Sequence, residues 1–144
     1  MTPAPPPVFL SIVVPAYRER ANLETTCREI LRAFDAAALP DVEIIVVEDH
    51  SEDGSAELLA ELAAAEPRIR PLINSVRLGF GLSIRKAFEV SRGEAVCLAM
   101  ADLSDSPTDM VVYYRRLQAG AECVFGSRFI PGGRVFQYPR LKLL

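Results

Sequence analysis

The chain has 144 residues, of which 50% are hydrophobic and 24% are charged, and its formal net charge at pH 7 is −3. This length predicts one domain with a buried core, and the acidic balance excludes a general electrostatic surface for nucleic acid. The charges are interspersed without a polybasic run, and no apolar run approaches the ~20 residues that span a bilayer, so an anionic ligand would need a local site.

The first half of the chain predicts a leader, two strands and a helix. Residues 1–8 contain four prolines and lack the positive charge of a signal peptide, so we expect a flexible leader. A strand is predicted at 9–14, ended by Pro15, and a helix is predicted from Asn22, a suitable N-cap. The near-continuous apolar run at 42–47 is typical of a central strand buried on both faces.

Strands and helices continue to alternate in the second half. The predicted elements are a helix between Gly54 and Pro67, a strand at 69–73, a helix from Gly79 to about Ser91, a strand at 95–101, a helix from Ser106 to Gly120 and a strand at 121–125. Ser106, Pro107 and Asp109 form a capping-box arrangement at the start of the last helix. This alternation indicates an α/β fold with a mostly parallel sheet flanked by helices.

The cysteines give no sign of a disulfide framework or a zinc site. Cys27, Cys97 and Cys123 are an odd number, widely spaced and without a C-x-x-C pair, which favours a reducing cytosolic compartment. Each lies in an apolar pattern, so all three are predicted to be small buried hydrophobic residues. Tyr113 and Tyr114 are predicted to pack against the domain or to lie at its solvent edge.

Polar and charged side chains follow several predicted strands at the end where ligands bind in an open parallel sheet. They are Tyr17 and Glu19 after the first strand, Glu48 and Asp49 after the second, Asp102 and Asp105 after the fourth, and Arg128 after the fifth. Carboxylates gathered at one edge are costly unless they pair with cations or a metal. Oxygen ligands suit Mg²⁺ or Mn²⁺, which are commonly held by one or two carboxylates plus substrate phosphates.

These residues also have purely structural interpretations. Asp102 and Asp105 could cap the following helix, and Glu48-Asp49 could form only a turn at the end of a strand. His50 is predicted to be an exposed turn residue and not a catalytic base. Residues 79–81 (Gly-Phe-Gly) indicate a tight passage from strand to helix, because a dinucleotide fingerprint would follow the first strand and not the third.

Five segments, in this order, resemble glycosyltransferases of family 2. They are 11–19 (V-I-V-P-x-Y-x-E in the family), 43–55 (E-I-I-V-V-D-D-G-S-x-D-G-T), 78–87 (L-G-x-G-x-A), 100–107 (D-A-D-L-S-H-x-P) and 126–133 (G-S-R-[FY]-x-x-G-G). The last element is similar to that of dolichyl-phosphate (polyprenyl-phosphate) mannosyltransferases and their bacterial relatives. The resemblance therefore covers nearly the whole chain.

The resemblance implies a Rossmann-like GT-A fold and a role for each matching residue. Residues 9–130 would form the nucleotide-sugar-binding domain, and 131–144 would begin an acceptor-side region that is truncated. Pro15, Tyr17 and Glu19 would line the nucleoside pocket, Glu48 and Asp49 would contact base and ribose, Asp102 and more weakly Asp105 would bind the metal, and Arg128 and more weakly Arg140 would contact phosphate. Asp102 and Arg128 would be the catalytic residues.

The implied reaction is an inverting transfer of mannose or a similar sugar from a GDP- or UDP-sugar to polyprenyl or dolichyl phosphate. It would take place at the cytoplasmic face of a membrane, with peripheral membrane contact and no nucleic acid partner. Because the acceptor is already an anionic phosphate, catalysis would depend on alignment and on neutralisation of the leaving group by Mg²⁺ or Mn²⁺. Two alternatives remain. The first half of the fold is shared by many acceptor specificities, which leaves a family 2 enzyme with a saccharide acceptor. Met100, which replaces the usual first aspartate of the 100–107 segment, and the truncation leave an inert nucleotide-sugar-binding fragment.

Overall fold

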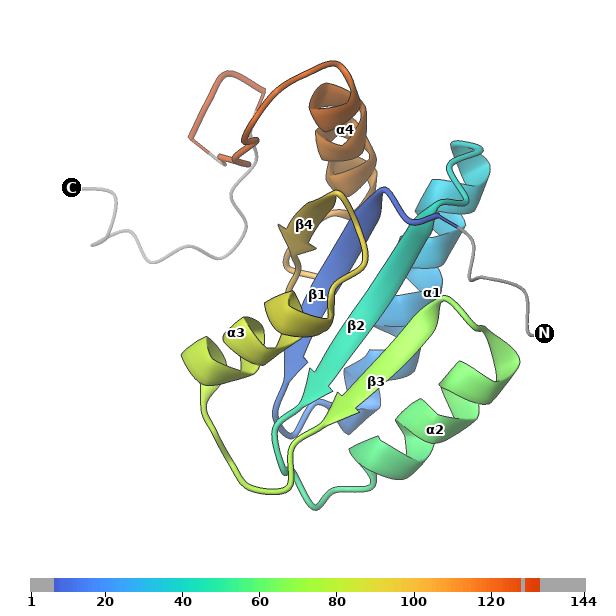
Figure 1. Ribbon diagram of the computed structural model, residues 1–144, viewed down its shortest axis with the longest axis vertical. Helices are drawn as coiled ribbons and strands as arrows, with labels where there is room; N and C mark the ends of the chain where they lie inside the picture. The colour runs from blue at the N-terminus through green and yellow to red at the C-terminus, as the bar shows by residue number, and fades with distance from the viewer. Residues whose placement is uncertain (1–6, 128, 133–144) are drawn as a thin grey trace.

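A four-stranded parallel sheet organises the residues that the computed structural model describes, which are 7–127 and 129–132 (Figure 1). The elements in chain order are β1 (Leu10–Ala16), α1 (Arg20–Ala36), β2 (Val42–Glu48), α2 (Ser55–Ala65), β3 (Ile69–Ile73), α3 (Phe80–Val90), β4 (Ala95–Leu98) and α4 (Pro107–Gln118). The strand order is β3-β2-β1-β4, and every pair is parallel. The predicted α/β class is therefore confirmed.

The central strands β1 and β2 pair along their full length, from Leu10 opposite Val42 to Ala16 opposite Glu48. Every residue of both strands is buried, and for β2 this confirms the prediction of a run covered on both faces. The prediction that Pro15 ends β1 is wrong, because the strand continues to Ala16. The carbonyl of Val13 accepts a hydrogen bond from the N–H of Ala99, which lies just past the end of β4. Because backbone groups alternate along a strand, the nitrogen of Pro15 faces the same side, beyond the end of β4. Proline is tolerated there because the sheet loses no hydrogen bond between strands.

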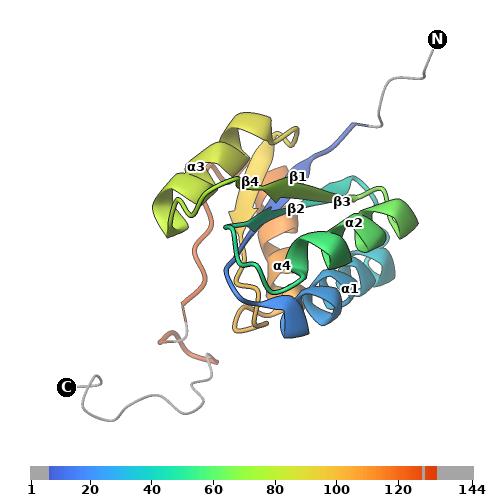
Figure 2. The same ribbon diagram turned by 90° about the horizontal axis from the view of Figure 1, so that it is seen from below.

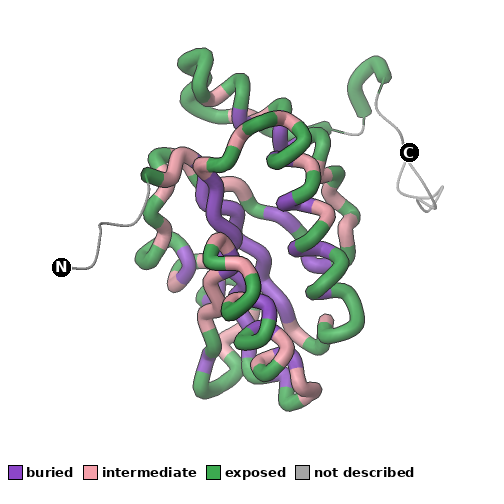
Figure 3. Tube along the Cα trace, turned by 90° about the vertical axis from the view of Figure 1, so that its right-hand side faces the viewer, coloured by how far each residue is buried: buried purple, intermediate pink, exposed green. Residues whose placement is uncertain are grey.

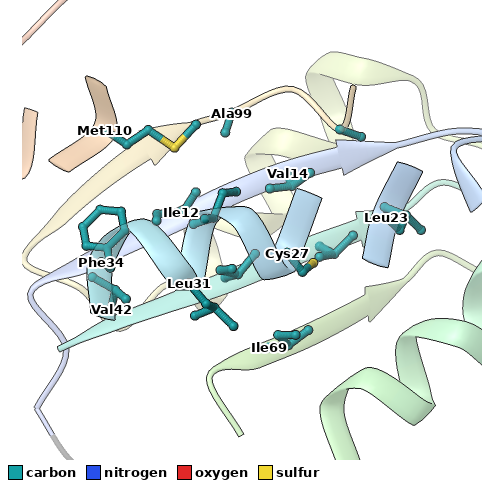
Figure 4. Packing of buried hydrophobic residues seen from close by; sticks show 14 of the residues in the cluster. Ile12, Val14, Leu23, Cys27, Leu31, Phe34, Val42, Ile69, Ala99 and Met110 are labelled. Carbon is teal, nitrogen blue, oxygen red and sulfur yellow. The ribbon is translucent and has the colours of Figure 1, made fainter. Parts of the chain in front are cut away.

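The two faces of the sheet are covered unequally (Figure 2). Helices α1, α2 and α4 lie on one side, which we call the three-helix face, and α3 lies alone on the other, which we call the single-helix face. The main core lies on the three-helix face, where alternate residues of β1 and β2 meet α1 and α4 (Figure 4). It includes Ile12, Val14, Leu23, Cys27, Phe34 and Met110. The single-helix face buries a smaller apolar cluster: Val13, Ile45, Val47 and Ala87.

Colouring by burial shows the central strands buried and the outer sides of the helices and loops exposed (Figure 3). Tyr114 of α4 is 1% exposed, as predicted for a packing residue. Its ring centroid lies 4.7 Å from that of Phe9 and 5.9 Å from that of Phe34. Its hydroxyl donates to the carboxylate of Asp41 at 2.7 Å. Among the described residues, no helix combines the length and apolarity that crossing a membrane requires.

The predicted strand at 121–125 is wrong. The structure forms no strand after α4 within the described residues, and Phe125 is 86% exposed. A strand needs a neighbouring strand to pair with. In the described sheet β4 is an edge strand that pairs only with β1, so residues 121–125 do not pair with it. The prediction that all three cysteines are buried is correct for Cys27, where burial raises the pKa to about 11, but Cys97 is half-buried and Cys123 is exposed.

Helix starts also differ in detail from the prediction. Helix α1 begins at Arg20, and Asn22 lies inside its first turn and donates to the side chain of Glu19 at 2.7 Å. Helix α4 follows Ser106 with Pro107 at its first position, as predicted, but no side chain caps it. The hydroxyl of Ser106 instead pairs with that of Thr108 at 2.8 Å, so the predicted capping box is wrong.

Candidate functional site

A cavity of about 260 Å³ opens at the carboxyl edge of the sheet. Five of the residues predicted from the sequence to form the site line it: Pro15, Tyr17, Glu19, Asp49 and Asp102. Pro15 lies near the end of β1, and the other four come from the loops after β1, β2 and β4, which the parallel topology brings to one edge. Glu48 and Asp105 do not line the cavity, and Arg128 and Arg140 lie outside the described residues.

The loop after β1 presents an aromatic ring to a cation from a distant loop. The guanidinium carbon of Arg77 lies 3.9 Å from the ring centroid of Tyr17, and that of Arg18 lies 5.3 Å from it. Both distances fall within the range of cation–π attraction. The loop is fixed by the N–H of Arg18, which donates to the hydroxyl of Ser51 at 2.9 Å. Tyr17 and Arg77 therefore form a single wall of the cavity.

Glu48 is engaged in the turn that follows β2. Its carboxylate accepts the N–H of Ser51 at 2.7 Å and the N–H of His50 at 3.2 Å. The side chain is only 3% exposed and is not part of the cavity lining. This geometry matches the structural interpretation, a turn at the end of a strand. His50 is exposed in that turn, as predicted.

Asp49 lines the cavity but is only 5% exposed, and it is bound to the loop between β3 and α3. Its carboxylate accepts the N–H of Leu78 at 2.8 Å, the N–H of Gly79 at 2.7 Å and the side-chain amide of Asn74 at 2.9 Å. Burial alone would raise the pKa of Asp49, but these hydrogen bonds outweigh it and leave the pKa below its ordinary value. An ionised Asp49 therefore ties down the loop that carries Arg77.

The same network anchors α3. The side-chain amide of Asn74 also lies 3.1 Å from the hydroxyl of Ser83, and its oxygen accepts from the ammonium of Lys86 at 2.9 Å. Gly79 precedes the helix with φ 82°, a left-handed conformation that glycine adopts without steric cost. This confirms the predicted tight passage from strand to helix at 79–81.

The loop after β4 carries the two acids predicted to bind metal. Asp102 is exposed and lines the cavity, and its carboxylate accepts the N–H of Ser104 at 3.0 Å. Hydrogen bonds from the hydroxyl of Ser104 and, to a smaller extent, from this N–H lower the pKa of Asp102. The carboxylate of Asp102 is therefore ionised at neutral pH. Asp105 accepts the N–H of Met100 at 3.0 Å. No side chain caps α4, which contradicts the alternative that these acids are helix caps.

The donor atoms fit a metal only in part. No three His, Cys, Asp or Glu side chains gather as a metal site among residues 7–127 and 129–132. Asp102 offers an exposed hard oxygen ligand, whereas Met100, also on the cavity wall, offers a thioether that suits a hard cation poorly. One carboxylate completed by ligand phosphates is a usual arrangement for Mg²⁺, and Asp102 can supply that carboxylate.

Sequence reasoning missed Arg77 and Phe80. Both line the cavity, and Phe80 is 55% exposed there. Their signal was present, because a cation and an aromatic residue flank Leu78-Gly79, where the segment after the predicted strand at 69–73 leads into a helix. The glycines of that segment were interpreted only as backbone geometry.

A larger hollow of about 610 Å³ lies between α1 and α2 at the start of β3. None of the predicted site residues lines it. Arg68, one of the three arginines that line it, is held by Asp35 at 2.6 Å and by Glu66 at 2.9 Å, so these opposite charges already pair with one another. The cavity at the carboxyl edge is the candidate site.

Comparison with known proteins identifies relatives along most of the chain. Residues 11–144 match the family described as Glycosyl transferase family 2. The polyprenol monophosphomannose synthase of Mycolicibacterium smegmatis is 34% identical over 137 residues, which cover 92% of this chain and 50% of that protein. The dolichol-phosphate mannosyltransferase of Pyrococcus furiosus is 28% identical over 130 residues, 90% of this chain and 36% of that protein. The chain thus spans half or less of the length of these curated relatives.

Solved structures share the fold. The mannosyltransferase PcManGT from Pyrobaculum calidifontis, in complex with GDP-Man and Mn²⁺, superposes with a TM-score of 0.62 at 22% identity, over 73% of this chain and 30% of that one. Staphylococcus aureus TarS 1-349, in complex with UDP-GlcNAc, gives 0.57 at 19% identity, over 76% and 32%. These similarities establish the predicted Rossmann-like GT-A fold.

Proposed function

The chain belongs to glycosyltransferase family 2, and on that premise we propose that it binds the nucleotide-sugar donor of an inverting transferase that moves mannose or a similar sugar to polyprenyl phosphate. One observation carries the proposal: five residues predicted for the donor site line one cavity at the carboxyl edge of the sheet. The names of the relatives, polyprenol monophosphomannose synthase and dolichol-phosphate mannosyltransferase, favour mannose and a lipid phosphate.

We assign the donor contacts to Tyr17, Glu19 and Arg77. The planar guanidinium of Arg77 is suited to phosphate oxygens, and its place on the Tyr17 ring holds it at the cavity wall. Glu19 offers a carboxylate acceptor for a base or a ribose. Asp49 already accepts three hydrogen bonds from the chain, so its proposed role is to position the Arg77 loop. Glu48 is assigned to its turn.

Asp102 is the proposed ligand for Mg²⁺ or Mn²⁺ on the donor diphosphate. A bound divalent cation supplies neutralisation of the charge that develops on the leaving group. The acceptor phosphate needs no general base, which agrees with His50 lying outside the cavity lining. Arg128 and Arg140 remain predicted phosphate contacts, and Asp105 remains a predicted weaker metal ligand. The proposed site of action is the cytoplasmic face of a membrane.

Calorimetric titration of the chain with GDP and with UDP, each with and without Mn²⁺, tests the proposal. We expect one nucleotide to bind, and its affinity to fall by about tenfold or more without Mn²⁺ or in an Asp102→Asn variant, because the metal-bridged diphosphate contact is lost. Asp109→Asn, an exposed acid in the first turn of α4, is the matched control and should bind as the wild type does. A folded chain that binds neither nucleotide would contradict the assignment.

A second candidate function is donor binding without transfer. Met100 on the cavity wall favours it, since a thioether in place of the family's aspartate weakens the metal site. Incubation with GDP-mannose and polyprenyl phosphate, or with a saccharide acceptor, separates the candidates. Product on the lipid supports the first function, product on the saccharide supports a different family 2 enzyme, and binding without product supports the second candidate.

A further inference from the structure

Exposed hydrophobic side chains gather in one segment, residues 73–90, which comprises the end of β3, the loop after it and all of α3. The segment contains six of the thirteen large hydrophobic residues exposed in the described part of the chain. They are Ile73, Val76, Phe80, Leu82, Phe88 and Val90, which are between 38% and 58% exposed. Scattered surface hydrophobics are ordinary, but a contiguous group marks an interaction site.

The same segment is positively charged on an acidic protein. It carries three cations, Arg77, Arg85 and Lys86, against one acid, Glu89, whereas the whole chain has a net charge of −3. The side chain of Arg85 is 78% exposed, and its ion pair with Glu89 is long, at 3.9 Å. The bonding partner of Lys86 is the neutral amide of Asn74. With three cations and one acid, the segment therefore keeps an excess of positive charge.

Helix geometry places both kinds of side chain on the outer side of α3. Leu82, Arg85 and Phe88 follow at intervals of three residues and are all exposed, whereas Ser83 and Ala87 are buried against the sheet. Helix α3 lies alone on its face of the sheet, so no other described helix covers this outer side (Figure 2). A helix that combines outward apolar residues with cations is typical of a membrane surface.

The opposite side of the molecule has a different surface. On α1 the exposed residues include charged pairs, with Arg28 held by Glu24 at 2.8 Å and Arg32 held by Glu29 at 3.0 Å. None of the thirteen exposed large hydrophobics of the described chain lies on α1 or α2. Among the described residues, α1 and α2 therefore present a charged surface without exposed large hydrophobics, in contrast to residues 73–90.

We propose that residues 73–90 form the surface by which this chain binds an anionic lipid bilayer. The inference rests on the proposed function, because a polyprenyl phosphate acceptor resides in a bilayer. It goes further by naming the contact. The segment also contributes Arg77 and Phe80 to the cavity wall, so binding through it brings the mouth of the cavity next to the plane of the lipid phosphates.

Co-sedimentation with vesicles of phosphatidylcholine alone, or with about 30% phosphatidylglycerol added, tests the proposal. We expect the wild-type chain to sediment with the anionic vesicles only, and high salt to release it, because screening weakens the contact of cations with anionic lipids. Leu82→Gln/Phe88→Gln and Arg85→Glu should each lower the bound fraction by about fivefold or more. Val112→Gln on α4 and Arg32→Glu on α1 are the matched controls and should bind as the wild type does.

Three outcomes would overturn the proposal. They are failure of the wild-type chain to bind anionic vesicles, equal loss in the control variants, and a dimer seen by sedimentation velocity that the α3 variants abolish, which would make the occupant a second copy. The substituted side chains are exposed, so circular dichroism should be unchanged. Calorimetry with nucleotide but without vesicles keeps the two proposals apart: its failure in a vesicle-binding chain contradicts the donor site alone.

Discussion

The three-helix face and the single-helix face of the sheet share the same strands but are held together by different interactions. On the three-helix face, twenty buried residues form one apolar cluster. On the single-helix face the buried apolar cluster has four residues, and two carboxylates, Glu43 and Asp49, are buried beside it. The first face resembles the core of an ordinary domain, whereas the second depends on charge-assisted hydrogen bonds.

Glu43 shows how the thinner face is held. Its carboxylate accepts from the hydroxyl of Ser11, from Arg70 and from the side chain of Arg92, each at 2.7 Å. These partners belong to β1, to β3 and to the segment after α3, so one acid links three segments on this face. Asp49 does the same for the loop between β3 and α3. The comparison shows a division of roles: the three-helix face supplies most of the apolar packing, and the single-helix face holds the loop that shapes the candidate site.

The largest expected effect compares two neighbours on β2 that point to opposite faces. Ile44→Ala on the three-helix face should cost about 4 kcal/mol of unfolding free energy, near the upper end for buried isoleucine. Ile45→Ala on the single-helix face should cost about 2.5 kcal/mol, because α3 alone covers that cavity and can settle into it. Urea denaturation of both variants measures the difference, and equal costs would break the comparison.

The next effect tests the charge network. Burial raises the pKa of Glu43, but hydrogen bonds from Ser11, from the N–H of Arg92 and from both arginine side chains outweigh it, so the folded pKa lies below the ordinary value. A lowered folded pKa stabilises the protein above the unfolded pKa of about 4.3, and this stabilisation is lost as the pH falls through the folded value. Glu43→Gln should therefore cost about 2 to 3 kcal/mol at pH 7 and much less below pH 4.

Denaturant titrations at several pH values check this prediction. Glu61→Gln, an exposed acid in α2, serves as the control and should leave the pH dependence of stability unchanged. A constant difference between wild type and Glu43→Gln from pH 7 to pH 3 would mean that ionisation of Glu43 does not stabilise the single-helix face.

Much of the fold could be predicted from the sequence, because strands and helices leave local periodic patterns. The order of the eight observed elements was predictable, and so was the meeting of acids at one edge, since parallel strands place their carboxyl ends together. The strand at 121–125 could not be settled in the same way. Its apolar pattern is local, but strand formation depends on a neighbour that is distant in the sequence.

The side-chain networks lay beyond local patterns. Glu43 lies within the near-continuous apolar run at 42–47, and a charge inside a buried strand requires partners. Those partners, Arg70 and Arg92, are 27 and 49 residues away in the sequence, so the local pattern does not reveal them. Arg77 reaches Tyr17 from a loop that Asp49 holds through the N–H groups of Leu78 and Gly79. In the linear sequence the cations of 73–90 are interspersed, so they did not predict a membrane surface. Only the helical geometry of α3 brings Arg85 alongside exposed apolar residues.

A smaller effect separates positioning from stability on the single-helix face. Asp49→Asn removes a carboxylate acceptor shared by Leu78 and Gly79, and it should cost about 1 to 2 kcal/mol of stability. The loosened Arg77 loop should also lower nucleotide affinity by about fivefold or more, measured by calorimetry. The control is Asp53→Asn, because Asp53 accepts the N–H of Ser55 at 3.0 Å outside the cavity. It should lose stability without losing affinity; a matching loss of affinity would refute the positioning role.

The smallest effect concerns His50, which lies in a turn and belongs to neither face of the sheet. His50 has φ 58° in the turn after β2, a left-handed conformation that costs a residue with a Cβ about 1 to 2 kcal/mol. His50→Gly relieves this strain but raises the entropy of the unfolded chain, so the net gain should be about 0.5 kcal/mol. In α2, Glu61→Gly should instead lose about 1 kcal/mol. Because His50 does not line the cavity, nucleotide affinity should stay constant in the variant, and a change in affinity would show that the turn is coupled to the donor site.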